Sequence, residues 1–176
     1  GLRDALRLLD ALPDDEDGLR AELAHEVATL LYQRHEDGDV DGFDVAPDYC
    51  EIAETLGHFD AYATHEEIIM RAEGVSYSNY SFLPAIKNRY SEKDVKAPNA
   101  LMSLWQRCTH DALERIDEIE QWSSEAKHAV FACVLAHLAC SVPEKSFESV
   151  HAQAKVSSRG RWCLPLLERV ATAIDR

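Results

Sequence analysis

Apolar side chains recur at steps of three and four residues along most of this 176-residue chain. This spacing places them on one face of an α-helix, whereas a half-buried strand would need strict alternation. The clearest runs are Leu19, Leu23, Val27, Leu30 and Leu31, and then Leu101, Trp105, Cys108, Ala112, Ile116 and Ile119. Residues 125–142 are apolar nearly all round, which is typical of a helix buried by its neighbours. We therefore predict an all-α fold of seven or eight helices around this central helix.

Prolines and capping residues predict where several helices begin and end. Pro13 should end a short amphipathic N-terminal helix, and Pro47 should lie in the first turn of another helix. Thr64 and Glu67 have the spacing of a capping box, which predicts a helix start at this point. Pro165 is expected in the first turn of the last helix.

The chain length favours a single α-helical domain, residues 1–176, large enough to bury a core without a metal or a disulfide. Within it we distinguish an acidic part (1–74), a long irregular segment (75–97) and a helical C-terminal part (98–176). The irregular segment is rich in serine and tyrosine and is interrupted by Pro84. Such long segments are uncommon in compact domains, and they are usually either functional loops or structural elements that the pattern does not reveal.

The cysteines and the apolar runs bear on the compartment. Five cysteines are an odd number, and none forms a Cys-x-x-Cys pair, so we expect free and mostly buried thiols. Free thiols favour a reducing compartment, and we expect a cytoplasmic protein. No apolar run approaches the roughly 18 residues of a membrane span, and the start of the chain is amphipathic, so no membrane association is expected.

Charge is distributed very unevenly along the chain. The formal net charge is −14. Residues 1–74 hold 20 acidic and 5 basic residues, whereas residues 75–176 hold 12 acidic and 13 basic residues. A protein that binds nucleic acid through phosphate contacts needs a basic face, so direct nucleic-acid binding is not expected.

Five of the acidic residues lie between residues 37 and 48, and they admit three interpretations. The stretch Asp37-x-Asp39-x-Asp41-Gly42 resembles the first half of an EF-hand loop, in which alternate carboxylates converge on one calcium ion. The resemblance ends there, because the eighth position is Asp44 and the twelfth is Asp48 instead of glutamate. A calcium site would use Asp37, Asp39, Asp41 and Asp48. The other interpretations are a solvated turn and a surface for a basic partner.

Our first functional hypothesis is a non-enzymatic protein whose acidic surface binds and masks a basic protein. Crowded like charges repel one another, and a basic partner relieves that cost. Inhibitors of the immunity-protein type and adaptors use this physics, although the likeness is one of mechanism only. The residues expected to bind the partner are Asp14, Asp15, Asp37, Asp39, Asp41, Phe43, Asp44 and Asp48, with Tyr32 and Tyr49 as further apolar anchors.

The alternative is a helical domain that binds a small anion through the irregular segment. That segment is locally basic and rich in tyrosine. The residues expected to contact the anion are Tyr77, Tyr80, Lys87 and Arg89.

Other motifs have ordinary structural explanations. Glu22 and His25 have the Glu-x-x-His spacing of di-iron bundles, and Arg20 with His25 has the spacing of HEPN-type ribonucleases. Helical geometry places Glu22 and His25 away from the apolar stripe, so we expect both to face away from the core. His137 is expected to be a buried core histidine and Cys163 an unreactive thiol. No residue is assigned as catalytic, and no cofactor is expected apart from the calcium alternative.

Overall fold

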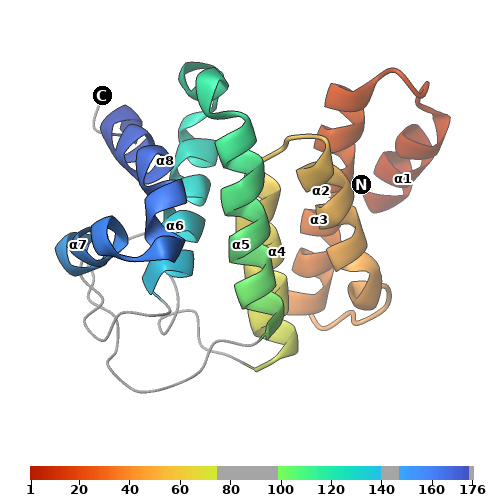
Figure 1. The fold of residues 1–176 in the computed structure, drawn as a ribbon. Helices are drawn as coiled ribbons and strands as arrows, with labels where there is room; N and C mark the ends of the chain where they lie inside the picture. The colour runs from red at the N-terminus through yellow and green to blue at the C-terminus, as the bar shows by residue number, and fades with distance from the viewer. Residues whose placement is uncertain (75–98, 140–146, 175–176) are drawn as a thin grey trace. The chain divides into compact units, whose positions relative to one another are not determined.

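The computed structural model describes residues 1–74, 99–139 and 147–174. These residues form eight α-helices and two 3₁₀ turns, with no strand among them (Figure 1). The predicted all-α fold is confirmed. The chain divides into two compact units, Gly1–Ile69 and Met70–Arg176, and this boundary lies close to the change of charge after residue 74. The assignment of the whole chain to one domain stays a prediction.

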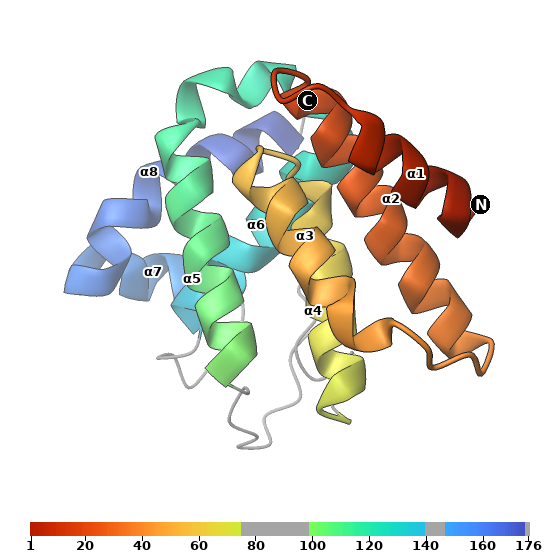
Figure 2. The same ribbon diagram turned by 90° about the vertical axis from the view of Figure 1, so that its right-hand side faces the viewer.

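Unit 1 (Gly1–Ile69) is built around the longest of the described helices. Its elements are α1 (Leu2–Ala11), α2 (Asp17–Glu36), the 3₁₀ turn η1 (Phe43–Val45), α3 (Ala46–Thr55) and most of α4 (Asp60–Ala72). Both α1 and α3 pack on α2 (Figure 2). Pro47 lies in the first turn of α3, as predicted, because its missing N–H is not needed there.

The capping box predicted at Thr64 is wrong. α4 begins at Asp60, so Thr64 lies inside the helix. The first turn is formed by backbone hydrogen bonds from the N–H of Ala61 to the carbonyl of His58 and from the N–H of Tyr62 to that of Phe59. Ala61 and Tyr62 are completely buried, and burying them as part of the helix outweighs the local capping signal.

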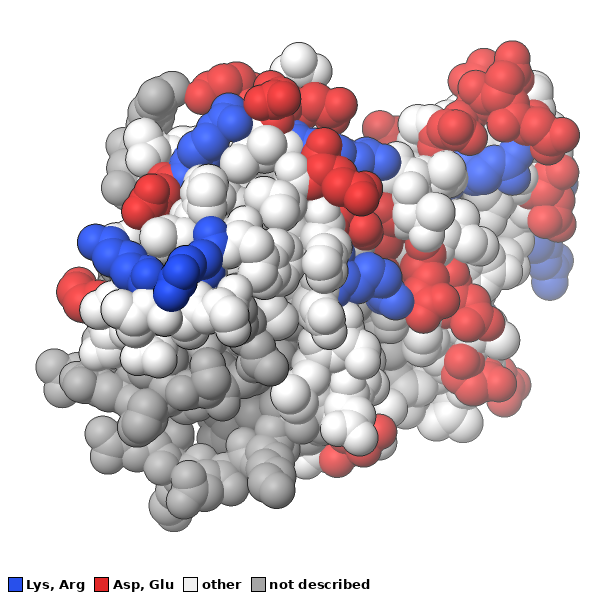
Figure 3. Space-filling view, in the orientation of Figure 1, with Lys and Arg blue, Asp and Glu red and all other residues white. Residues whose placement is uncertain are grey.

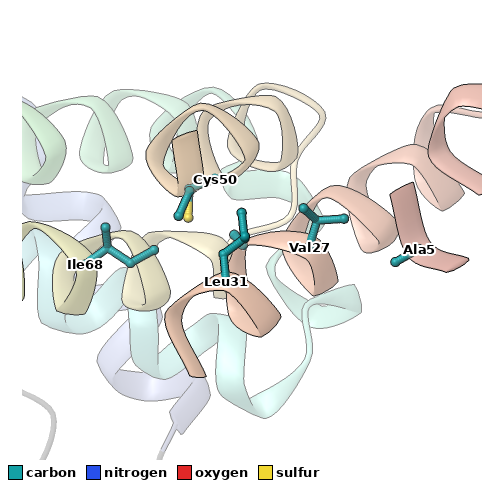
Figure 4. Packing of buried hydrophobic residues seen from close by; sticks show 7 residues of the cluster. Ala5, Val27, Leu31, Cys50 and Ile68 are labelled. Atoms are coloured by element: carbon teal, nitrogen blue, oxygen red, sulfur yellow. The ribbon is translucent and has the colours of Figure 1, made fainter. Parts of the chain in front are cut away.

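The core of unit 1 joins all four of its helices. A buried cluster contains Ala5 of α1, Val27 and Leu31 of α2, Cys50 of α3 and Ile68 of α4 (Figure 4). A second cluster consists of one alanine from each of α2, α3 and α4: Ala24, Ala53 and Ala61, all fully buried. Alanine leaves the helices free to approach one another closely at this point.

Unit 2 (Met70–Arg176) surrounds the predicted central helix. Its elements are α5 (Asn99–Glu114), the 3₁₀ turn η3 (Ile116–Gln121), α6 (Ser124–Ala139), α7 (Phe147–Val156) and α8 (Ser158–Ile174). α6 packs against α5, α7 and α8, and every residue from Ala129 to Leu138 is buried. The central position of α6 within unit 2 follows directly from its apolar character on all sides.

The prediction that Pro165 lies in the first turn of the last helix is wrong. α8 begins at Ser158, and Pro165 lies in its interior with an exposed side chain. The start of α8 packs against α7 so closely that a Cβ on Gly160 would lie 2.3 Å from the Cα atom of Ala154. Helix packing through this glycine extends α8 to the N-terminal side of the proline. Similarly, α5 ends at Glu114, and the apolar steps at Ile116 and Ile119 continue into η3.

Four of the cysteines, Cys50, Cys108, Cys133 and Cys163, are free and buried, as predicted; Cys140 lies outside the described residues. None of the described helices combines the length and the apolar character needed to cross a lipid bilayer.

Candidate functional site

The acidic residues predicted to bind a partner lie in two groups at the two ends of α2. Asp14 and Asp15 precede its N-terminus, and residues 37–48 follow its C-terminus. A helix of 20 residues is about 30 Å long. The two groups are therefore separate, as the loops at the two ends of α2 show in Figure 1. Figure 3 shows acidic side chains gathered over the α1–α2 loop, where the N-terminal group lies.

The N-terminal group has a local structural role. Arg20 donates hydrogen bonds to the carbonyl oxygens of Leu12 (3.3 Å) and Pro13 (3.0 Å), and its guanidinium lies 3.8 Å from the carboxylate of Asp14. Glu16 and Asp17 occupy the N-cap and the first turn of α2. Negative charge is favourable there because the helix dipole is positive at this end. Arg20 thus closes the α1–α2 loop, which explains its presence without a ribonuclease activity.

At the other end of α2, Asp39 organises the acidic loop. Its carboxylate accepts hydrogen bonds from Nε of Arg34, at 2.9 Å, and from Nη2 of the same guanidinium. It also accepts one from the backbone N–H of Asp41, at 3.2 Å. The hydrogen bonds from Arg34, and then that from Asp41, lower the pKa of the Asp39 carboxyl. Asp39 is therefore already paired by a cation of its own chain.

Phe43 anchors the same loop on the core. Its ring stacks on His35 with a centroid distance of 3.9 Å, lies 6.5 Å from the ring of Tyr32, and packs against the buried cluster of unit 1. Gly42 precedes it with φ of +79°, and a Cβ there would lie 3.2 Å from the Leu31 side chain. Phe43 and Tyr49 are only half-buried, and both pack against the buried cluster of unit 1.

The exposed side chains around this loop form a mixed acidic and apolar surface, which we call the acidic face. Three exposed apolar side chains belong to it: Val40 is 64% exposed, Ile52 40% and Val45 39%. Val45, Asp48 and Ile52 follow one another at helical spacing, so they lie on one side of α3. The acidic face consists of Asp37, Val40, Asp41, Asp44, Val45, Asp48, Glu51 and Ile52, all exposed.

Sequence reasoning missed the three apolar members of the acidic face. Ile52 lies next to the fully buried Ala53, yet its own side chain is 40% exposed. A signal was available: Val45 and Ile52 share the helical register of Asp48 and not that of the buried Cys50 and Ala53. This register places Val45 and Ile52 on the same side of the helix as the carboxylate of Asp48.

The calcium interpretation needs at least three convergent ligands. In the part of the chain that the structure describes, no three His, Cys, Asp or Glu side chains are gathered so that they could hold a metal ion. Asp37, Asp39, Asp41 and Asp48 all belong to this part. The pairing of Asp39 with Arg34 replaces the metal contact that an EF-hand carboxylate would make.

The prediction that His25 faces away from the core is wrong. It is half-buried, its Nε2 lies 2.8 Å from Oγ1 of Thr64 on α4, and its ring centroid lies 4.6 Å from that of His58. The α3–α4 turn and α4 cover a side of α2 that its apolar stripe does not predict. Glu22 is exposed, as predicted, so the two do not face a shared metal.

Unit 2 buries Cys163 and His137, the two residues that the sequence analysis singled out there. The thiol of Cys163 is buried and donates to the carbonyl of Gly160 at 3.4 Å. His137 is buried, as predicted, with its ring edge-on to Trp162 at 6.0 Å. A shallow groove of about 280 Å³ runs beside α8, lined by Ile119, Glu120, Pro165, Glu168, Arg169, Thr172 and Ala173. Neither Cys163 nor His137 lines it.

The residues of the anion-binding alternative, Tyr77, Tyr80, Lys87 and Arg89, lie outside the described residues.

Comparison with known proteins gives no match: no family model, curated protein or solved structure is similar to this chain. What the protein does is therefore inferred from its own residues.

Proposed function

We propose that this protein is a non-enzymatic helical binding protein whose acidic face binds and masks a basic surface of another protein, as an inhibitor, an immunity-type protein or an adaptor. The observation that carries the proposal is the acidic face itself. It combines five exposed carboxylates with three exposed branched apolar side chains on one loop and one helix.

The position of the carboxylates supports binding over local stability. Asp37 is the C-cap of α2, where the helix dipole is negative and an added negative charge is unfavourable. Asp48 lies in the first turn of α3, where the helix dipole favours negative charge, but Asp44 lies four residues before it, and like charges at this spacing repel each other. Several carboxylates are thus held near one another at an energetic cost, which lysines and arginines of a partner would offset.

The apolar side chains distinguish this surface from a simple solvated turn. Val40, Val45 and Ile52 are branched residues that gain little from exposure to water, and together they supply the apolar centre that a protein interface needs. Carboxylates alone would attract any cation and would be screened by salt. Apolar side chains exposed beside these carboxylates add shape-dependent contact, so they favour a protein partner over a free cation.

The proposed partner is a basic protein and not a nucleic acid, because phosphates would be repelled by the acidic face. We also propose a cytoplasmic location, since four free and buried cysteines suit a reducing compartment.

The proposal can be tested by placing a photo-crosslinking amino acid at Ile52 in cells that make the protein. A matched control places the same amino acid at Val156, which is exposed on α7 in unit 2. The proposal expects one dominant adduct from position 52, with a protein of high isoelectric point, that is absent from position 156. The same adducts from both positions, or adducts from position 52 with acidic proteins only, would contradict it.

A further inference from the structure

A junction of polar residues ties α2, α3 and α4 together inside unit 1. His25 of α2 pairs with Thr64 of α4 at 2.8 Å, and Glu54 of α3 pairs with Nδ1 of His65 of α4 at 2.7 Å. Glu54 and His65 are both buried. The fully buried alanines of the same three helices, Ala24, Ala53 and Ala61, form a second cluster between these helices. Two polar pairs and a close alanine contact therefore hold α4 to its neighbours.

The surroundings of His25 disfavour a positive charge on its ring. The α3–α4 turn brings the imidazole of His58 to 4.6 Å, and α4 brings the neutral hydroxyl of Thr64. The carboxylate of Glu54 is paired with Nδ1 of His65. On α2 itself Glu22 is exposed, and the charged side chains of α1, which also packs on α2, are exposed as well. Burial, followed by the charge of His58, lowers the pKa of His25 to about 4.

We propose that this junction is an acid-sensitive latch: proton uptake by His25, packed against His58 and Thr64, loosens α2 and α4 of unit 1. Two imidazoles this close repel each other when both are charged, and movement of the α3–α4 turn and α4 away from α2 relieves that repulsion. The inference concerns the stability of unit 1 and does not depend on the proposed partner. Because the acidic face lies on the same unit, acid would also remove that surface.

The direction of the pH effect follows from proton linkage. The pKa of His25 is lower in the folded chain, about 4, than the ordinary value of 6.5. The stabilising contribution of the neutral ring is complete above pH 6.5 and is lost as the pH falls from 6.5 towards 4. Between pH 7 and pH 5 this raises the equilibrium constant for opening by a factor on the order of 20.

A second group acts in the opposite direction. Burial, followed by Glu36 of α2, raises the pKa of Glu67 on α4. Protonation of Glu67 in mild acid therefore relieves repulsion and stabilises the folded chain. For this reason the comparison of wild type with a His25 variant is more informative than the wild-type pH dependence alone.

The test is amide hydrogen exchange on the full chain at pH 7 and pH 5, expressed as protection factors. The variants are His25→Gln, His58→Gln and, as a control, His128→Gln, whose ring contacts only a backbone carbonyl of its own helix among the bonds the structure gives it. We expect protection in α2 and α4 to fall on acidification in wild type and in His128→Gln, relative to α6. The fall should be several-fold smaller in His25→Gln and intermediate in His58→Gln.

An equal fall in all four proteins, or none in the wild type, would overturn the proposal. If His25→Gln does not fold, His58→Gln and an NMR titration of the wild-type His25 ring decide. A ring that titrates near pH 4 supports the latch, and one that titrates near its ordinary value of 6.5 overturns it.

Discussion

The carboxylates at the two ends of α2 have opposite effects on the stability of the helix. At the N-terminus, Glu16 and Asp17 lie where the helix dipole favours negative charge. At the C-terminus, Glu36 and Asp37 lie where the same dipole opposes it. The last turn carries Arg34 and His35, but Arg34 is paired with Asp39.

This difference separates carboxylates that stabilise the fold from carboxylates that need another explanation. The N-terminal group forms part of a helix start closed by Arg20. In the C-terminal group Asp39 is paired with Arg34, and Asp48 lies in the first turn of α3, where the helix dipole favours negative charge, while Asp37, Asp41 and Asp44 are exposed in the stretch between the two helices. The carboxylates that we expect to bind a partner therefore belong to the C-terminal group.

The largest stability effect is expected where the C-terminal loop is anchored on the core. Phe43→Ala removes a ring that stacks on His35 and packs on the buried cluster. Replacing a fully buried phenylalanine by alanine lowers the free energy of unfolding by about 3–5 kcal/mol. For this half-buried ring we expect a loss of about 2 kcal/mol. Urea denaturation measures it. Val40→Ala, at an exposed site of the same loop, should change stability by less than about 0.5 kcal/mol; equal losses would show that the loop is not anchored by Phe43.

The next prediction concerns the pairing of Asp39. Arg34→Gln should raise the pKa of the Asp39 carboxyl towards its ordinary value of 3.8, because the hydrogen bonds from Arg34 are the main cause that lowers it. In the wild type, this pairing stabilises the folded chain above the ordinary pKa and is lost as the pH falls through the lower, folded value. A carboxyl-carbon NMR titration measures the shift. Arg20→Gln is the control and should leave Asp39 unchanged.

Removing one charge at each end of α2 should change the free energy of unfolding by smaller amounts of opposite sign. Asp17→Asn removes a favourable charge at the N-terminus of α2 and should destabilise the protein by about 0.5 kcal/mol at low ionic strength. Asp37→Asn removes an unfavourable charge at the C-cap and should stabilise it by a similar amount. Paired urea titrations at low and high salt measure both. If both variants are destabilised, the contrast between the two ends is wrong.

Calcium is expected to have no effect. A specific site filled to about 100 times its dissociation constant adds roughly 2.7 kcal/mol, which is several degrees in Tm for a chain of this size. Because Asp39 is paired with Arg34, thermal melts in EDTA and in millimolar calcium should coincide. A calcium-dependent rise in the wild type that is absent from Asp41→Asn would establish a metal site instead.

Much of the fold could be predicted because the helices carry strong apolar periodicity. The all-α class, the buried α6 and the position of Pro47 all follow from local sequence. The failures have tertiary causes. The starts of α4 and α8 were misplaced because burial of Ala61 and Tyr62, and packing through Gly160, outweigh the local signals at Thr64 and Pro165.

The candidate site was only partly predictable. The acidic loop stands out in the sequence, but its division into paired and exposed carboxylates depends on where Arg34 points. Phe43 was predicted to contact the partner, and no sequence pattern indicated that its half-buried ring would also stack on His35 of the preceding helix. The contact between His25 and His58 joins residues from different elements, which no single-helix pattern reveals.

The most direct test of the proposed function compares charge reversal at the two ends of α2. Asp44→Lys/Asp48→Lys changes the acidic face, and Asp14→Lys/Asp15→Lys makes the same change in charge at the other end. With the basic protein captured through position 52, calorimetry should show binding weakened by about 30-fold or more, roughly 2 kcal/mol, for the first variant. The second variant should bind within about threefold of the wild type, since its charges lie about 30 Å away, beyond the Debye length. Equal weakening by both variants would mean that only the total charge matters, and it would contradict a defined acidic face.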